Sequence, residues 1–240
     1  MRSLRVLLLF CIIWSISQAQ QSFLYKTTLV QAAPGKLLEL IELYKYKFAN
    51  DSAMGEPRPF MVRHSQGDKW DLFILFPLVS YPDYFTSARM AKRQRSEWVE
   101  MERRIQQLIS WREDVFVWGP SKEEVHKSFN GTTFFHIEMF VALPGKKDEL
   151  YKEREMENTY QRALKRPENL IFIRDQGASW DLFTVGAFRD IKHYAESADI
   201  AEKDQEIAAR EAGFESARHI GPYLRTLIRE HHDTLANLVK

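Results

Sequence analysis

The sequence predicts an α+β fold made of two copies of one unit, in which strand, helix, strand, strand, helix and strand follow each other. The main observation is an internal repeat, because the segment Lys69–Phe73 returns as Ser179–Phe183 at a displacement of 110 positions. The segment Pro34–Lys36 returns at the same displacement as Pro144–Lys146. A period of this length indicates duplication of a whole small domain rather than a solenoid.

The first copy shows strand and helix patterns in alternation. Residues 23–31 alternate in polarity and are rich in Thr, Val and aromatic side chains, which is typical of a strand. Pro34 suits a first helical turn, and apolar residues then recur at helical spacing to about Phe48. The segment Gln66–Asp68 predicts a hairpin turn. The expected strands are 23–31, 60–64, 70–78 and 115–118, and the expected helices are 34–48 and 82–111.

The second copy repeats this order with a longer second helical region. Asp114 precedes the closing strand of the first copy and Asp233 that of the second, so the displacement grows to 119 and about nine residues are added. We therefore divide the chain into a first repeat at 20–118, a polar linker at 119–131 and a second repeat at 132–240. The expected strands are 133–141, 170–174, 180–188 and 234–239, and the expected helices are 144–164 and 191–228.

The first 19 residues predict a secretory signal peptide. Arg2 and Arg5 form a basic start, Val6–Ile16 is apolar but too short to span a bilayer, and Ser17–Ala19 fits the small-x-small cleavage pattern. The alternative is an uncleaved anchor. We expect an exported, periplasmic or extracellular protein with no stable membrane insertion after cleavage.

Composition limits the classes of partner and site. Cys11 is the only cysteine and lies in the predicted signal, so we expect no disulfide and no cysteine-based metal site in the mature chain. Loss of Arg2 and Arg5 changes the formal net charge from +1 to −1, which argues against nucleic-acid binding. Asn50 and Asn130 match the glycosylation acceptor pattern, which matters only in a eukaryotic secretory route.

The order of elements in each copy is the ferredoxin-like arrangement, in which two helices cover one face of a four-stranded sheet. The other face would be an exposed apolar surface unless the two copies place these faces together. On this element order and duplication, the chain resembles the dimeric α/β-barrel superfamily, as a tandem fused pseudo-dimer. The superfamily includes cofactor-independent monooxygenases, isomerases and haem-binding proteins. The resemblance implies a small-molecule ligand between the sheets, in a monomeric pseudo-dimer or a higher homo-oligomer.

Two polar residues on the first strand of the second copy are candidate catalytic residues. His136 and Glu138 alternate with an apolar set that we assign to the helix-covered core, so the pair is expected to face the space between the sheets. They can carry a proton in acid–base catalysis or supply two metal or haem ligands. The alternative is a cross-strand ion pair. The apolar set is Phe135, Ile137, Met139 and Val141.

The repeated Trp-Asp pairs supply further candidates. Asp181 is the third candidate catalytic residue, and Asp71 is its equivalent in the first copy, assigned to ligand binding. Trp70 and Trp180 are candidate ligand-binding residues as well. The alternative is structural, because an acidic residue in an apolar strand is costly to bury unless it is paired, and tryptophans are mostly core residues.

His64 and Arg174 end the second strand of each copy and are candidate contacts for an anionic ligand. The alternative is that they pair with the nearby aspartates. Adjacent His231 and His232 are expected to point apart, so no metal site is predicted from them.

Three functions remain open from the sequence. The first is a small-molecule enzyme with His136, Glu138 and Asp181 as acid–base groups. The second is a protein that binds haem or another planar ligand, with His136 or His64 as axial ligand. The third is a non-catalytic scaffold or interaction module. Since Lys26 and Thr28 replace the polar pair in the first copy, we favour a small-molecule function at one site.

Overall fold

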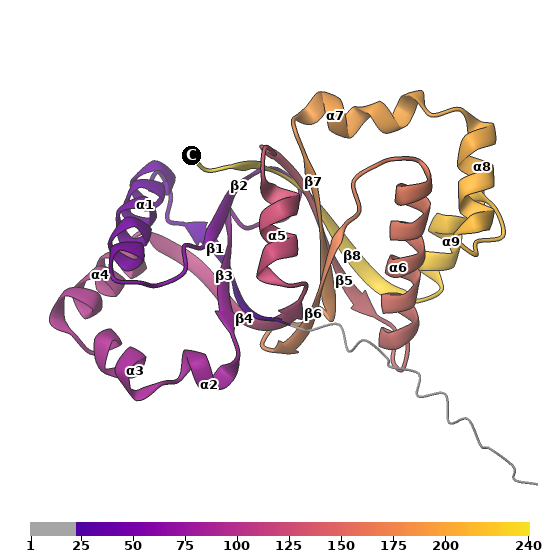
Figure 1. The fold of residues 1–240 in the computed structure, drawn as a ribbon. Coiled ribbons are helices and arrows are strands. Elements are labelled where there is room, and N and C mark those ends of the chain that lie inside the picture. The colour runs from indigo at the N-terminus through magenta and orange to yellow at the C-terminus, as the bar shows by residue number, and fades with distance from the viewer. Residues whose placement is uncertain (1–22) are drawn as a thin grey trace, which may run out of the picture.

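A computed structural model describes residues 23–240 and shows eight strands that close one barrel, with helices outside it (Figure 1). The predicted signal peptide at 1–19 lies outside the described residues. Within 23–240, none of the helices combines the length and the apolar character needed to span a bilayer.

The first half contains a four-stranded antiparallel sheet in the order β4-β1-β3-β2. The helix expected over 82–111 is three helices. Thr86 accepts a hydrogen bond from the Arg89 backbone N–H and caps the second of them, and extended backbone at Arg95 separates the second from the third. The elements are β1 (Phe23–Ala32), α1 (Leu37–Ala53), β2 (Phe60–Gln66), β3 (Leu72–Val79), α2 (Tyr81–Tyr84), α3 (Ser87–Arg93), α4 (Ser96–Gln107) and β4 (Ile109–Gly119).

The linker contains a helix that was not predicted from the sequence, α5 (Lys122–Phe129). Ser121 and Glu124 form a reciprocal capping box at its start, a signal that is visible in the sequence. The second half follows with the sheet order β8-β5-β7-β6. Its elements are β5 (Phe134–Ala142), α6 (Lys147–Ala163), β6 (Leu170–Gln176), β7 (Leu182–Phe188), α7 (Ile191–Ala195), α8 (Glu202–Glu211), α9 (Ile220–Arg225) and β8 (Ile228–Leu238), with 3-10 turns at Glu196–Asp199 and Ala217–His219.

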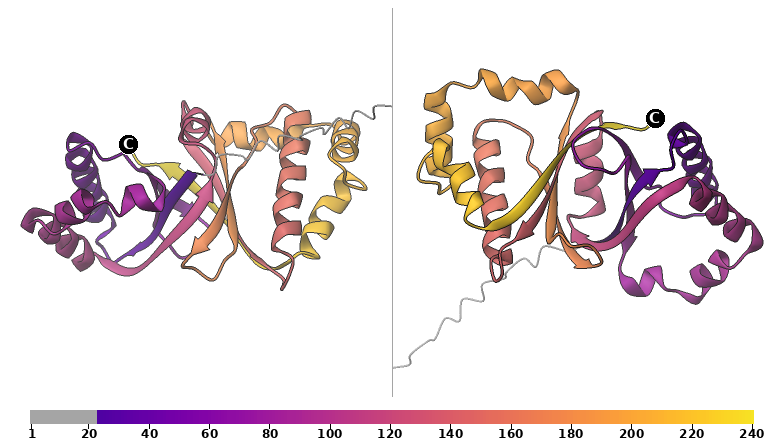
Figure 2. Two further views of the ribbon diagram at one scale, coloured as in Figure 1. Left: turned by 60° about the horizontal axis from the view of Figure 1, so that its bottom comes forward. Right: turned by 180° about the vertical axis from the view of Figure 1, so that it is seen from behind.

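The two sheets join at both edges, where β2 pairs with β8 and β4 pairs with β6, each antiparallel. Figure 1 shows β8 running from the second half to the first, so the C-terminus lies beside the first half. The helices of the two halves lie on opposite sides of the barrel in the views of Figure 2. The predicted fold, two tandem ferredoxin-like units in a dimeric α/β-barrel arrangement, is confirmed.

The barrel interior is filled by apolar side chains from both halves. The Phe183 ring lies 5.4 Å from the ring of Phe73 and 4.7 Å from that of Phe172, measured between centroids. The apolar set of β5 is part of this core. Because both halves contribute to it, the core is the buried interface of the pseudo-dimer. Its members include Tyr25, Leu29, Val62, Trp70, Phe73, Leu75, Val115, Val117, Phe135, Ile137, Met139, Phe172, Trp180, Phe183 and Val185.

This packing corrects the predicted position of the site. Since Phe135 and Ile137 point into the barrel, His136 and Glu138 point outwards, towards the helices. The two faces of β5 were therefore assigned the wrong way round from the sequence, because both faces are covered and apolar character alone does not distinguish them. Packed aromatic rings occupy the space between the two sheets, where the ligand was expected from the sequence.

Candidate functional site

A cluster of titratable side chains lies on the helix-facing side of β5 and β8. Alternation along β5 puts His136 and Glu138 on this face, and the register of β8 places Asp233 opposite Glu138. His136 Nε2 is 3.3 Å from Asp233 Oδ1. One ligand atom from each of the three residues lies within 4.8 Å of the others. The three residues together are called the proton cluster below.

Helix α6 covers the proton cluster with a buried arginine. The Arg154 side chain is only 2% exposed and makes a bidentate contact with Glu153, at 2.6 and 2.8 Å. Its Nη1 atom is 2.6 Å from Glu157 Oε2 and 3.8 Å from Glu138 Oε2. Its guanidinium also lies 4.8 Å from the centroid of the Phe140 ring. One arginine thus holds three carboxylates, so negative charge exceeds positive charge around Glu138.

This environment changes the pKa values of the proton cluster. Burial, followed by the negative charge of Glu157, raises the pKa of Glu138 to about 7. Burial opposes charge on His136, but the hydrogen bond to Asp233 and the charge of Glu138 together raise its pKa. The same hydrogen bond lowers the pKa of Asp233. Near neutral pH, therefore, a proton can reside on Glu138 or on His136.

Neighbouring groups orient the cluster and leave it accessible. Thr184 Oγ1 donates a hydrogen bond to Glu138 Oε2 at 3.2 Å, and His231 Nε2 lies 3.0 Å from Asp233 Oδ2. The Asp233 side chain is 50% exposed and that of His136 is 20% exposed, whereas Glu138 retains 13%. Solvent therefore reaches the cluster at Asp233.

The cluster is also the group of described residues most suited to a metal ion, since it offers one imidazole nitrogen and two carboxylates. His231 and His232 do point apart as predicted, the first to Asp233 and the second to Asp68, whose Oδ1 is 3.8 Å from His232 Nδ1. As a haem ligand through Nε2, His136 would have to exchange its Asp233 contact for iron.

The two repeated aspartates have equivalent positions and bind backbone. Asp71 Oδ2 accepts a hydrogen bond from the Ala32 amide at 2.8 Å, and Asp181 Oδ2 accepts one from the Ala142 amide at 2.9 Å. Each carboxylate thus fixes the end of the first strand of its half to the start of the third strand, which pairs with it. The structural alternative accounts for both aspartates, and Asp181 is not part of the proton cluster.

The remaining candidate residues lie around the barrel core. Trp70 is 1% exposed and Trp180 is 6% exposed, and both belong to the interior cluster. The His64 ring lies 5.9 Å from the Trp70 ring, and Arg174 pairs with Asp181 at 2.8 Å. The tryptophans match the core alternative and Arg174 matches the ion-pair alternative. His64 does not pair with an aspartate, because its Nε2 is buried without a hydrogen-bond partner among residues 23–240. The structure does not bring these residues together with His136 and Glu138.

The first half carries an equivalent of the cluster with different chemistry. At the displacements found in the sequence, Lys26 replaces His136, and Asp114 corresponds to Asp233. Lys26 Nζ lies 3.5 Å from Asp114 Oδ1. His136 Nε2 lies at a similar distance, 3.3 Å, from Asp233 Oδ1. The duplicated geometry is thus retained while the proton-exchanging histidine is replaced by a lysine.

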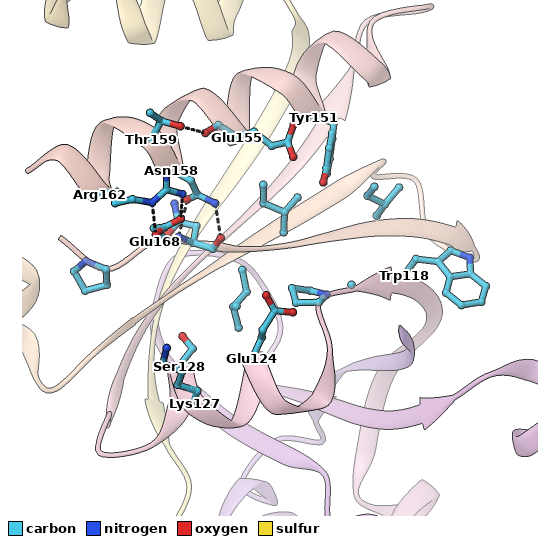
Figure 3. A pocket seen from close by; sticks show the side chains of 17 residues that line it. Trp118, Glu124, Lys127, Ser128, Tyr151, Glu155, Asn158, Thr159, Arg162 and Glu168 are labelled. Carbon is cyan, nitrogen blue, oxygen red and sulfur yellow. Dashed lines mark hydrogen bonds and ion pairs between the residues drawn. The ribbon is translucent and has the colours of Figure 1, made fainter. Parts of the chain in front are cut away.

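An open groove of about 740 Å³ lies between α5, α6 and β6 (Figure 3). Asn158 Nδ2 donates to the Asn169 carbonyl at 2.8 Å, and Arg162 pairs with Glu168 at 2.5 Å. Thr159 donates to the Glu155 carbonyl. These side chains are engaged within the protein, and none of the predicted site residues lines the groove. We therefore place the candidate site at the proton cluster.

No protein-family model matches the sequence, and a search of curated proteins found no significant match. Solved structures do match over nearly the whole chain. An anthrone oxidase-like protein aligns with a TM-score of 0.58 at 10% identity, covering 92% of this chain and 93% of that one. A candidate monooxygenase from Lactobacillus acidophilus aligns with a TM-score of 0.56 at 8% identity, covering 91% and 93%. A mutant chlorite dismutase from Candidatus Nitrospira defluvii aligns with a TM-score of 0.50 at 10% identity, covering 91% and 92%.

Proposed function

We propose that this chain, a fused pseudo-dimer with the dimeric α/β-barrel fold, binds a small organic molecule at the proton cluster and transfers a proton to or from it. The observation that carries the proposal is a buried Glu138 with a pKa of about 7 beside His136 and Asp233. A group with a pKa near the working pH is effective both as a base and as an acid. The likeness in fold to an oxidase-like protein and a candidate monooxygenase supports a small-molecule substrate.

Each member of the cluster has a role that follows from its contacts. Glu138 accepts the proton from the ligand, because burial keeps its carboxylate basic. His136, held by Asp233, takes up or returns a proton from the solvent-exposed side. Arg154 is a positioning residue, since its contacts with Glu153 and Glu157 fix the part of helix α6 that covers Glu138.

Hydrogen exchange tests this function across a range of candidate substrates. The protein is incubated in D₂O with a panel of small ketones and keto acids, and loss of the C–H proton signal is followed by NMR. We expect catalysed exchange with at least one compound. In Glu138→Gln we expect the rate to fall about 10²–10⁴-fold, the usual contribution of a general base.

The matched control is Glu155→Gln, an exposed carboxylate on α6 outside the cluster. It should exchange at the wild-type rate. Equal rates for wild type and Glu138→Gln would contradict the proposal. Absence of exchange across the panel, with both variants folded, would favour the non-catalytic scaffold. Haem binding would instead give a coloured protein that loses its colour in His136→Ala.

We also propose that the protein is exported, on the basis of the basic, apolar and small-residue pattern of residues 1–19. N-terminal sequencing of the mature protein should then begin at Gln20. A mature chain that still starts at Met1 would contradict cleavage.

A further inference from the structure

The first half contains a small cavity at the position that the proton cluster occupies in the second half. The cavity has a volume of about 100 Å³ and lies between the outer face of β1, β3 and β4 and helices α1 to α4. Lys26 and Tyr44 line it, and they correspond to His136 and Arg154 at the repeat displacement. A space of this size accommodates a few waters or the polar group of a small molecule.

The charge around this cavity is opposite to that of the proton cluster. The lining contains six basic side chains and three acidic ones. Where the second half has Glu157, the first has Lys47, and where it has His231, the first has Arg112. Duplication has thus given one scaffold with an acidic site and a basic site. The basic residues are Lys26, Lys47, Arg89, Lys92, Arg93 and Arg112.

Two buried donors in the cavity lack a full set of acceptors. Tyr44 is 3% exposed, and its hydroxyl has no hydrogen-bond partner among residues 23–240. Burial raises the pKa of Tyr44, so the hydroxyl keeps its proton and remains a donor. An unpaired buried hydroxyl is costly, and a bound acceptor would remove that cost.

Lys26 is the second donor. Its side chain is 17% exposed and its ammonium has one carboxylate contact, Asp114 at 3.5 Å. The ammonium also lies 4.6 Å from the centroid of the Phe76 ring. An ammonium can donate three hydrogen bonds, so Lys26 retains capacity for a further acceptor. Arg93 stacks on Tyr84 at 3.9 Å and adds positive charge at the rim.

We propose that this cavity binds the oxyanion group of a small molecule, a carboxylate or a phosphate, through the Tyr44 hydroxyl and the Lys26 ammonium. An anion satisfies both donors and balances the excess of basic side chains. A neutral acceptor would satisfy Tyr44 alone, and a cation would be repelled. The aromatic rings of Tyr84 and Trp98 on the lining suit an apolar body attached to the anion.

Isothermal titration calorimetry of the full chain tests the proposal with three probes: sodium phosphate, sodium benzoate and neutral benzamide. The variants are Tyr44→Phe, which removes only the hydroxyl, and Lys26→Met. Tyr46→Phe and Lys45→Met are matched controls, because both residues lie on α1 outside the cavity and Lys45 pairs with Glu42. Thermal unfolding of each variant confirms that it is folded.

We expect at least one anion to bind saturably and benzamide not to bind. The dissociation constant should rise about tenfold in Tyr44→Phe and by at least about as much in Lys26→Met, as for loss of a hydrogen bond to a charged group. Both control variants should bind as the wild type does. Phosphate binding without benzoate binding identifies a phosphate ligand, and the reverse identifies a carboxylate ligand.

Three results would overturn the proposal. These are no saturable binding of either anion at roughly 10 mM, binding of benzamide as tight as that of the anion that binds, or equal affinity in Tyr44→Phe and Tyr46→Phe. The test is independent of the proton-transfer function, because Glu138 lies in the other half of the protein. The Glu138→Gln variant should therefore bind the anions as the wild type does.

Discussion

Substitution of Arg154 by Met is expected to lower the free energy of unfolding by about 3–5 kcal/mol. The Arg154 side chain is 2% exposed and its partner Glu153 is fully buried. Removal of the guanidinium leaves the carboxylates of Glu153, Glu157 and Glu138 without their shared cation. Breaking a buried pair by removing one partner costs this much because an uncompensated buried charge remains. Urea unfolding at pH 7 measures the loss.

The matched control is Arg162→Met on the same helix. Arg162 also pairs with a glutamate, Glu168 at 2.5 Å, but the two side chains are 61% and 42% exposed. Exposed pairs of this kind contribute about 0–1 kcal/mol. We expect the Arg154→Met loss to shrink at pH 5, where the freed carboxylates can take up protons. Equal losses of stability for the two variants at pH 7 would show that Arg154 does not stabilise the part of α6 that covers the site.

Replacement of Glu138 by Gln should make the protein more stable at pH 8, although it abolishes the proposed activity. The pKa of Glu138 rises from 4.5 to about 7 on folding, so the folded state binds the proton more tightly than the unfolded state does. Stability therefore falls as the pH rises from about 4.5 to about 7, and the deficit persists at higher pH. At 1.36 kcal/mol for each pKa unit, the rise from 4.5 to about 7 corresponds to a deficit of about 3 kcal/mol.

Gln has nearly the same shape as Glu and does not ionise, so Glu138→Gln lacks this deficit. We expect wild type and variant to differ by less than about 1 kcal/mol at pH 5 and by about 3 kcal/mol at pH 8. Paired urea titrations at the two pH values measure the difference, with the exposed Glu155→Gln as control. A variant less stable than the wild type at pH 8 would mean that ionisation of Glu138 does not lower the free energy of unfolding. The expected stability deficit of the wild type at pH 8 is typical of proteins that keep a functional residue at a cost in stability.

The overall fold was predictable because both copies carry the same local signals. The repeated Trp-Asp motif fixes the displacement, and the hairpin at Gly67 and its counterpart Gly177 both adopt positive φ, at 127° and 97°. Gly67 also needs to be glycine because an added Cβ would lie 2.1 Å from the Asp233 carbonyl. Local turn chemistry and hydrophobic period thus agree with the topology.

The face of β5 that carries the site was not predictable from alternation alone. In an open sheet the apolar face marks the core, but here one face meets the barrel interior and the other meets α6. Phe140 is buried on the helix side, and Phe135 is buried inside the barrel. Periodicity separates the two faces without saying which partner each one has.

Several residues of the two sites were missed because their strands were predicted too short. Asp233 lies in β8, which begins at Ile228 rather than Thr234, and Arg112 lies in β4, which begins at Ile109 rather than Val115. From the sequence, residues 109–111 and 228 were assigned to the preceding helices, and 112–114 and 229–233, which carry many charged residues, to no element. The equivalent positions of Asp114 and Asp233 in the two copies were the available signal. Arg154 and Tyr44 look like ordinary helix residues and required the tertiary structure.

The most direct test of the proton cluster is a pH titration of the Glu138 side-chain carboxyl by ¹³C NMR, assigned by comparison with Glu138→Gln. We predict a midpoint near 7, with an inflection in the His136 ring resonances at the same pH, because the charge of Glu138 acts on the His136 ring. A midpoint at or below about 4.3, the value of an unperturbed glutamate, would show an ordinary carboxylate and contradict the proposed proton transfer.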